Sequence, residues 1–294
     1  MSLGAAAMTI ETRAFRLTYP AEPTRVVRGK IDVLAEPRAS VRRPHVILLH
    51  GFKGFMDWGF FPEIAQRIAA LGFAVVRFNA SGSGIGDDLE NFTEPKAFEA
   101  NTLSREIEDL ERVRAWIRSG AAEGVDPDRA AMLGHSRGGG LALVHAAERG
   151  DLRCIVTWAA VATFDRFDAP SKQSWRSLGF LPVLNARTGQ ELRLGVSALD
   201  DLEQHRDRFD VPAACRRVRA PVLLVHGTAD ESVAFSESQR LLESLPAERA
   251  RLLAIEGAGH TFGVRHPMRG SHESGGDAWE KVARATVETI LRFG

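Results

Sequence analysis

Short, continuous apolar runs alternate with amphipathic segments from residue 45 to the end of the chain, with one interruption. Uninterrupted apolar runs are typical of strands buried on both faces, whereas helices against a sheet show apolar residues three and four positions apart. The runs occupy residues 45–50, 73–79, 129–135, 154–160, 221–227 and 250–257. This alternation predicts an α/β fold with a doubly wound, mostly parallel sheet that has helices on both faces.

The segments between the runs have helical spacing. We expect helices at residues 61–72, 103–120, 136–150, 235–245 and 277–292. The second of these places Leu103, Ile107, Leu110, Val113 and Ile117 on one stripe. Residues 11–34 alternate loosely around the triplet RGK, which predicts a β-hairpin or meander before the first parallel strand.

The interruption covers residues 161–211, which are richer in aromatic residues, Arg and Asp and contain no clear strand. We expect a core formed by residues 1–160 and 212–294, with 161–211 inserted as a cap. Ligands of open α/β sheets bind at the carboxyl edge of the strands, so the cap is expected over that edge.

Composition excludes several classes of protein. The 294 residues include 38 Lys and Arg against 38 Asp and Glu, so no global field attracts nucleic acid, and no nucleic-acid partner is expected. No apolar run reaches the ~18 residues of a membrane span. The first residues lack the basic segment of a signal peptide, which predicts a cytoplasmic location. Cys154 and Cys215 are expected to be free, buried thiols.

The pentapeptide Gly134-His135-Ser136-Arg137-Gly138 has the pattern G-x-S-x-G at a strand-to-helix boundary. A tight turn there holds the serine in a strained conformation with its hydroxyl exposed at the edge of the sheet. A serine that merely caps the helix in a glycine-rich turn is the structural alternative. The motif therefore makes Ser136 a candidate nucleophile.

A serine hydroxyl needs a base, and nine histidines are candidates. His260 stands apart because it follows the last apolar run in the loop sequence GAGH, at the sheet edge where Ser136 is expected. His266 and His272 lie in a polar loop and are expected to be solvated. The remaining histidines lie within or beside strands and helices or in the insertion: His45, His50, His135, His145, His205 and His226.

A neutral imidazole needs a partner that fixes its tautomer and stabilises the imidazolium. Asp230 follows the run 221–227 and supplies a carboxylate at the same edge. The order Ser136, Asp230, His260 is the order of an α/β-hydrolase triad, with each residue after a different strand. The backbone N–H groups of Arg137 and Phe52 are the expected oxyanion hole, with Lys53 as the reserve.

At these residues the sequence resembles the α/β-hydrolase superfamily. The segments LLHGFKG, GHSRGG, HGTADESV and GAGH occur in its order. The chain is most similar to the branch of dienelactone-hydrolase-like proteins, feruloyl and cinnamoyl esterases and prolyl-oligopeptidase-like peptidases. This resemblance implies a cofactor-independent serine hydrolase. One departure is Asn79, where many relatives have Asp near the expected pocket floor.

We therefore expect a serine hydrolase that cleaves small carboxylic esters through an acyl-enzyme. A small aminopeptidase or an acyltransferase on the same triad remains open, as does a non-catalytic binding protein with this fold. The glycine-rich segment 81–86 lacks the spacing of a dinucleotide-binding loop, so no cofactor is expected. No metal site is expected, because neither H-E-x-x-H nor a Cys/His cluster occurs. The sequence gives no oligomeric state.

The insertion offers candidates for substrate binding. Its aromatic side chains either line an apolar pocket or pack the cap onto the core; they are Phe164, Phe167, Trp175 and Phe180. Lys53 and Arg137 flank the expected nucleophile. Their charges favour an acidic acyl group unless the Arg137 side chain points to solvent.

Overall fold

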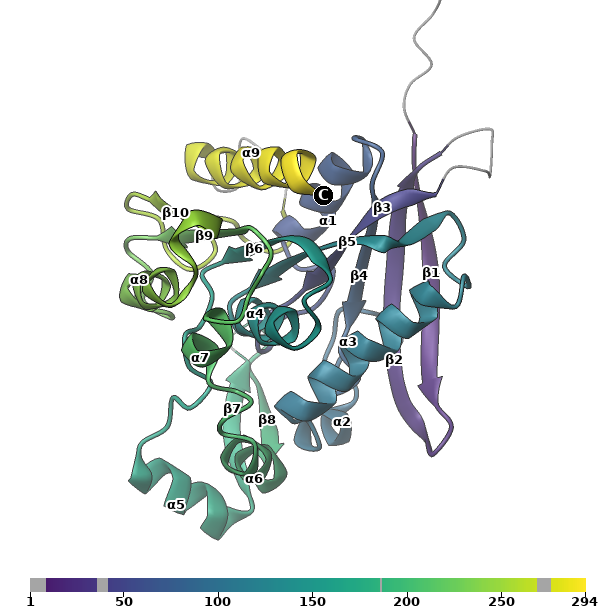
Figure 1. Cartoon of the computed structure of the whole chain (residues 1–294). Helices are drawn as coiled ribbons and strands as arrows, with labels where there is room; N and C mark the ends of the chain where they lie inside the picture. The colour runs from purple at the N-terminus through teal and green to yellow at the C-terminus, as the bar shows by residue number, and fades with distance from the viewer. Residues whose placement is uncertain (1–8, 36–41, 186, 269–275) are drawn as a thin grey trace, which may run out of the picture.

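The computed structural model describes residues 9–35, 42–185, 187–268 and 276–294 (Figure 1). Its main sheet has the order β1-β2-β4-β3-β5-β6-β9-β10. The strands are β1 (Ile10–Tyr19), β2 (Glu22–Leu34), β3 (Arg43–Leu49), β4 (Ala74–Asn79), β5 (Val125–His135), β6 (Leu152–Trp158), β9 (Val222–Gly227) and β10 (Ala250–Ile255). The pairs from β4 to β10 are parallel, while β1–β2 and β2–β4 are antiparallel. The predicted α/β sheet is confirmed.

Helices cover both faces of this sheet. On one face lie α1 (Phe60–Ala69) and α9 (Gly276–Phe293), which share an apolar cluster with one side of the strands (Figure 1). The opposite face packs against α3 (Leu103–Arg118), α4 (Arg137–Arg149), α7 (Val211–Cys215) and α8 (Phe235–Ser244). A 3₁₀ turn (Ala247–Arg249) precedes β10. Because both faces are covered, the central strands are buried along most of their length and rich in apolar residues.

The long helix α3 shows why the sequence pattern specifies the element. Thr102 caps its first turn, with the hydroxyl accepting a hydrogen bond from the Arg105 N–H at 3.1 Å. The stripe that includes Leu103 and Ile117 is buried against the sheet, as the spacing predicts. The helix continues until Ser119.

The N-terminal hairpin is present, but its turn lies between Tyr19 and Glu22. The triplet RGK lies inside β2, where Gly29 pairs with Phe15. A Cβ at position 29 would stand 2.1 Å from Phe15 Cζ. The absence of a side chain at Gly29 thus allows the Phe15 ring to lie against the backbone of β2, and the glycine does not form a turn.

The insertion contains strands, so the prediction that it has no clear strand is wrong. It forms α5 (Ala169–Leu178), a hairpin of β7 (Phe180–Asn185) and β8 (Gln190–Gly195), and α6 (Val196–Gln204). Gly189 takes a φ of 71° in the hairpin turn. The strands are six residues each and alternate exposed with buried positions, a weak pattern beside the long apolar runs of the core.

The insertion lies beyond the carboxyl ends of the central strands and packs on core loops (Figure 1). Trp175 and Leu192 share an apolar cluster with Phe55, Phe92 and Phe98. The last of these belongs to α2 (Pro95–Glu99). Trp175 is 2% exposed, and its indole N–H donates to the Leu194 carbonyl at 3.0 Å. The insertion is therefore held by a buried contact to the loops that follow β3 and β4.

Two further expectations concern cysteines and membrane spans. Cys154 and Cys215 are free and buried, as predicted, and burial raises the pKa of each thiol to about 12. Within the described ranges, no helix combines the length and apolar character needed to cross a membrane.

A histidine that is buried in its neutral form makes the free energy of unfolding depend on pH. His45 is 2% exposed, and burial lowers its pKa to about 4 despite its hydrogen bond to the Asp126 carbonyl. Between about pH 6.5 and 4 the unfolded chain binds the extra proton, so stability falls as pH falls through this window. For one such histidine the loss between about pH 7.5 and pH 5 is about 2 kcal/mol.

His45→Asn tests this, because the asparagine amide can still donate to Asp126. We expect the variant to lose about 2 kcal/mol less than the wild type over the same pH change in urea titrations. Parallel losses in the two proteins would show that His45 does not contribute.

Candidate active site

Ser136 lies in the turn between β5 and α4 with φ 56° and ψ −120°. An L-residue rarely adopts this conformation, so the strained turn expected from the motif is present. The Ser136 N–H donates to the Trp158 carbonyl at the end of β6 (2.8 Å), and its carbonyl accepts from Val161 at 3.3 Å. The backbone of the turn is thus bonded to the neighbouring strand and the segment after it.

Glycines allow the close packing that the turn requires. A Cβ on Gly134 would stand 2.3 Å from the Gly138 carbonyl oxygen, and one on Gly138 would stand 2.5 Å from the Leu49 carbonyl oxygen. Both distances are well below a van der Waals contact. The first turn of α4 therefore lies directly against the ends of β3 and β5, which presents Ser136 at the sheet edge.

Asp230 and His260 are brought together by the loops after β9 and β10. The Nδ1 of His260 lies 2.7 Å from Asp230 Oδ2 and donates to it. The other carboxylate oxygen accepts the backbone N–H groups of Ser232 at 2.8 Å and Val233 at 2.9 Å. The Asp230 carboxylate is fully buried, so these contacts fix its orientation.

The same contacts keep Asp230 ionised. Burial alone would raise the pKa of Asp230, but hydrogen bonds from His226, His260 and the Val233 amide outweigh it and hold the pKa below its usual value. The negative charge is therefore available to stabilise a proton on His260.

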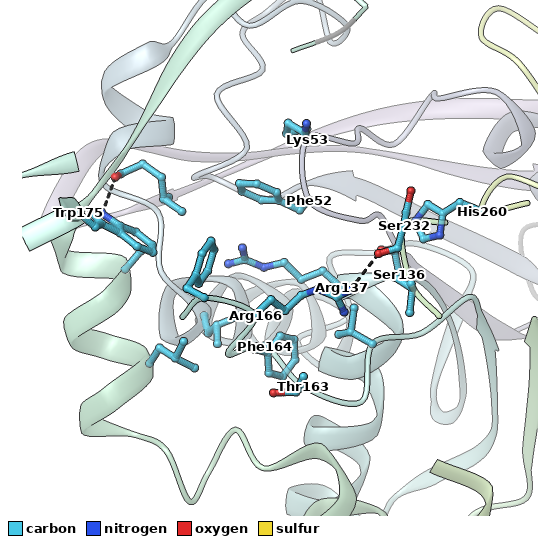
Figure 2. A pocket seen from close by; sticks show the side chains of 17 residues that line it. Phe52, Lys53, Ser136, Arg137, Thr163, Phe164, Arg166, Trp175, Ser232 and His260 are labelled. Atoms are coloured by element: carbon cyan, nitrogen blue, oxygen red, sulfur yellow. Dashed lines mark hydrogen bonds between the residues drawn. The ribbon is translucent and has the colours of Figure 1, made fainter. Parts of the chain in front are cut away.

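His260 is positioned by its backbone as well. The Nε2–H of His135 donates to the His260 carbonyl at 3.1 Å, and the two rings are 4.7 Å apart. Burial lowers the pKa of His135 to about 3, so it remains a neutral donor. Nε2 of His260 has no hydrogen-bond partner among the described residues, and the ring lies beside Ser136 in the cavity (Figure 2).

The loop after β3 also lies close to Ser136. A Cβ on Gly51 would stand 3.0 Å from Ser136 Cβ. Within the described part of the chain, neither the Phe52 nor the Arg137 backbone N–H is hydrogen-bonded. His50 fixes this loop, since its Nδ1–H donates to the Gly51 carbonyl at 2.9 Å. Two free amides therefore flank the serine.

A cavity of about 350 Å³ extends from Ser136 to the insertion. Figure 2 shows Ser136, Ser232 and His260 at one end and Trp175 at the other. Phe164, Phe167 and Trp175, three of the four aromatic candidates from the insertion, are among its lining residues. Sequence reasoning missed the other lining residues: Leu103, Val161, Thr163, Arg166, Leu194, Ala198, Leu202, Ser232 and Val233.

Phe180 does not line this cavity. It pairs with Gly195 at the start of the hairpin, and the Arg193 guanidinium lies 4.4 Å above its ring. Successive residues of a strand face opposite sides of the sheet. Leu194 lines the cavity, so its neighbour Arg193 and the Phe180 ring beneath Arg193 lie on the face that points away from the site.

The two cations beside Ser136 have partners. Lys53 Nζ donates to the Leu184 carbonyl in β7 at 3.1 Å. Arg137 Nη2 lies 2.7 Å from Glu106 Oε1, and its guanidinium covers the Phe52 ring at 5.2 Å. Arg137 therefore lies along the cavity wall and does not point to solvent, with part of its charge compensated.

Asn79 does not reach the cavity, in contrast to the pocket floor expected for it. Its Oδ1 accepts the Met56 N–H at 2.7 Å, and its Nδ2 donates to the Leu89 carbonyl at 3.4 Å. It joins two loops behind the site.

His266 and His272 were both expected to be solvated, and for His266 this expectation is wrong. His266 is largely buried: its Nδ1 accepts the Gly59 N–H at 3.0 Å, and its Nε2 lies 2.9 Å from Glu90. His272 lies outside the described residues. Across the described ranges, no group of three His, Cys, Asp or Glu side chains could hold a metal ion.

Comparison with known proteins decides the family. Residues 58–276 match the model of the prolyl oligopeptidase family. The chain belongs to this family. The α/β hydrolase GrgF from Penicillium sp. sh18 shares its fold, with 17% identity, a TM-score of 0.67 and coverage of 96% of this chain and 99% of that one.

Two other proteins are similar to this chain, one in fold and one in sequence. Est1E from Butyrivibrio proteoclasticus is 19% identical, with a TM-score of 0.64 over 95% of this chain and 98% of its own. The 2,6-dihydropseudooxynicotine hydrolase of Paenarthrobacter nicotinovorans is 26% identical over 85% of this chain and 62% of the relative. The chain spans 54% of the first curated relative that it matches.

The close packing around Gly138 gives a test of the turn. Gly138→Ala places a Cβ against backbone oxygens of Leu49 and His50, so we expect a loss of at least about 2 kcal/mol in unfolding free energy. Gly259→Ala is the matched control, because its Cβ would meet its nearest neighbour at 3.9 Å. Equal denaturation midpoints for the two variants would contradict this packing.

Proposed function

We propose that the protein is a serine hydrolase that cleaves carboxylic esters through an acyl-enzyme intermediate. The observation that carries the proposal is the convergence of three groups. Ser136 sits in a strained turn on the same cavity as His260, and His260 is bonded to the buried Asp230 at 2.7 Å. These groups are the nucleophile, base and orienting carboxylate that acyl transfer needs.

In the proposed reaction, Ser136 Oγ attacks the ester carbonyl while His260 Nε2 takes the hydroxyl proton. The proton then passes to the leaving alkoxide, which departs as an alcohol. Water repeats the sequence on the acyl-enzyme and releases the acid. Asp230 holds Nδ1–H of His260, so that Nε2 is the free base.

The Phe52 and Arg137 amides are the proposed oxyanion hole. Each is an unbonded donor beside Ser136. Donors of this kind each contribute ~3 kcal/mol to acyl transfer, because they meet the charge that develops on the carbonyl oxygen. Arg137 supplies its amide from the first turn of α4, where helix N–H groups are free.

The acyl group is proposed to occupy the apolar cavity toward Trp175. Its walls include Phe52 from the core and Phe164, Phe167 and Trp175 from the insertion. A volume of about 350 Å³ suits a small aromatic or medium-chain acyl group. The insertion is thus the proposed selector of the acyl group.

The family match supports a peptidase as the second candidate. The same three groups would cleave an amide, with His260 protonating the leaving amine. Comparing arylamide with ester substrates distinguishes the two.

Ser136→Ala should lower kcat by ~10⁵-fold or more on whichever substrate is cleaved. The substrates are p-nitrophenyl esters, feruloyl esters and aminoacyl arylamides. The variant should also lose labelling by a fluorophosphonate probe, since no other nucleophile is proposed. Labelling that survives the substitution would remove Ser136 from this role.

Activity should fall toward acidic pH, because a histidine base accepts the serine proton only in its neutral form. The pKa of Asp230 is held low, so Asp230 stays ionised across this range and adds no second step. The measurement is kcat/KM against pH in buffers of constant ionic strength. A rate that stays flat to about pH 4 would exclude a histidine base.

A further inference from the structure

A second imidazole lies behind Asp230. His226, at the end of β9, is fully buried, and its Nε2 stands 3.2 Å from Asp230 Oδ2 and 2.8 Å from the Val233 carbonyl. His260 Nδ1 donates to the same Oδ2 atom. One buried carboxylate oxygen therefore lies between two imidazole nitrogens, one from β9 and one from the loop after β10.

The neighbours of His226 determine its tautomer. Both groups next to Nε2 are acceptors, so Nε2 carries the hydrogen and donates to them. On the other side of the ring, Nδ1 lies 2.6 Å from the Ser238 hydroxyl, which is buried in α8. The hydroxyl donates to Nδ1. Both ring nitrogens of His226 thus have a partner, and the Nε2–H that donates to the Val233 carbonyl also lies 3.2 Å from Asp230 Oδ2.

We propose that His226 is a positioning residue that holds Asp230 and limits how strongly Asp230 attracts the proton of His260. The proposal rests on the proposed function, since it acts through the groups assigned there. Two donors on one oxygen share its negative charge, so each bond is weaker than it would be alone. His226 thereby leaves His260 able to release its proton to the leaving group.

Few other charged or titratable groups lie near His226, Asp230 and His260. In the part of the chain that the structure describes, Asp230 is the one charged group in contact with His226. Phe235 of α8 packs edge-on against the His226 ring at 5.8 Å. From β5, neutral His135 lies 4.7 Å from the His260 ring. The backbone amides of Ser232 and Val233 donate to the other carboxylate oxygen, Asp230 Oδ1.

Three variants separate this role from simple packing. His226→Leu removes the donor and fills the space, whereas His226→Gln keeps an N–H at similar reach. Ser238→Ala removes the hydroxyl that fixes the His226 tautomer. Two quantities are measured on the full chain: the NMR titration of ¹⁵N-labelled His260, which needs no substrate, and kcat/KM against pH.

In His226→Leu we expect the His260 titration midpoint and the acid limb of kcat/KM to move together to higher pH. The shift is about half a unit to one unit, because the freed Asp230 oxygen binds the imidazolium more strongly. kcat/KM near pH 7 should fall ~10-fold or more. His226→Gln should restore most of both quantities, and Ser238→Ala should show a smaller shift in the same direction.

An unchanged His260 titration in His226→Leu would overturn the proposal. If that variant does not fold, an unchanged titration in Ser238→Ala would overturn it instead. The proposal would also be overturned if His226→Leu and His226→Gln lost activity equally without a shift of the His260 titration. A shifted titration in a protein whose ester cleavage survives Ser136→Ala would support His226 as a positioning residue and refute the proposed function.

Discussion

The site depends on how closely backbone can approach backbone where β5 ends. Gly134 and Gly138 let the first turn of α4 rest on the ends of β3 and β5, at distances that no Cβ permits. In the same turn Ser136 has a positive φ of 56°. The same contact places the N terminus of α4 beside the loop that follows β3. A single steric constraint thus presents both the hydroxyl and two free amides at one point.

A second set of contacts holds the loop after β9. Asp230 accepts bonds from two backbone amides and two imidazoles, which leaves no freedom to the carboxylate. Arg166 adds to this, because it donates to the Ser232 carbonyl at 2.9 Å and to Glu237 at 2.7 Å. The start of the insertion is thereby bonded to the loop that carries Asp230.

Much of this arrangement could be predicted from residue order. Apolar runs specify the strands of the core, and the carboxyl edge of a parallel sheet collects whatever follows them. Ser136, Asp230 and His260 could therefore be placed together before any coordinates. The assignment of Phe52 and Arg137 to the oxyanion hole rests on the same reasoning, because the loop after the first parallel strand and the start of α4 meet at that edge, and it stays a prediction.

The rest could not be predicted, for physical reasons. The hairpin of the insertion has short strands. The alternation of exposed and buried residues along these strands can be recognised only once the apolar cluster around Trp175 is known. Phe180 was misplaced because one step along a strand reverses the side that a residue faces. His226 lies inside an apolar run and gives no local signal, because its partners Asp230 and Ser238 come from the following loop and helix.

The bond from Lys53 to the Leu184 carbonyl has a consequence for how this fold diversifies. It joins the loop carrying the Phe52 amide to the hairpin of the insertion, and the two also share a buried cluster. The insertion is therefore not an exchangeable module. Grafting the corresponding segment of another family member would alter the support of a loop beside Ser136, so selectivity and turnover would change together in such chimeras.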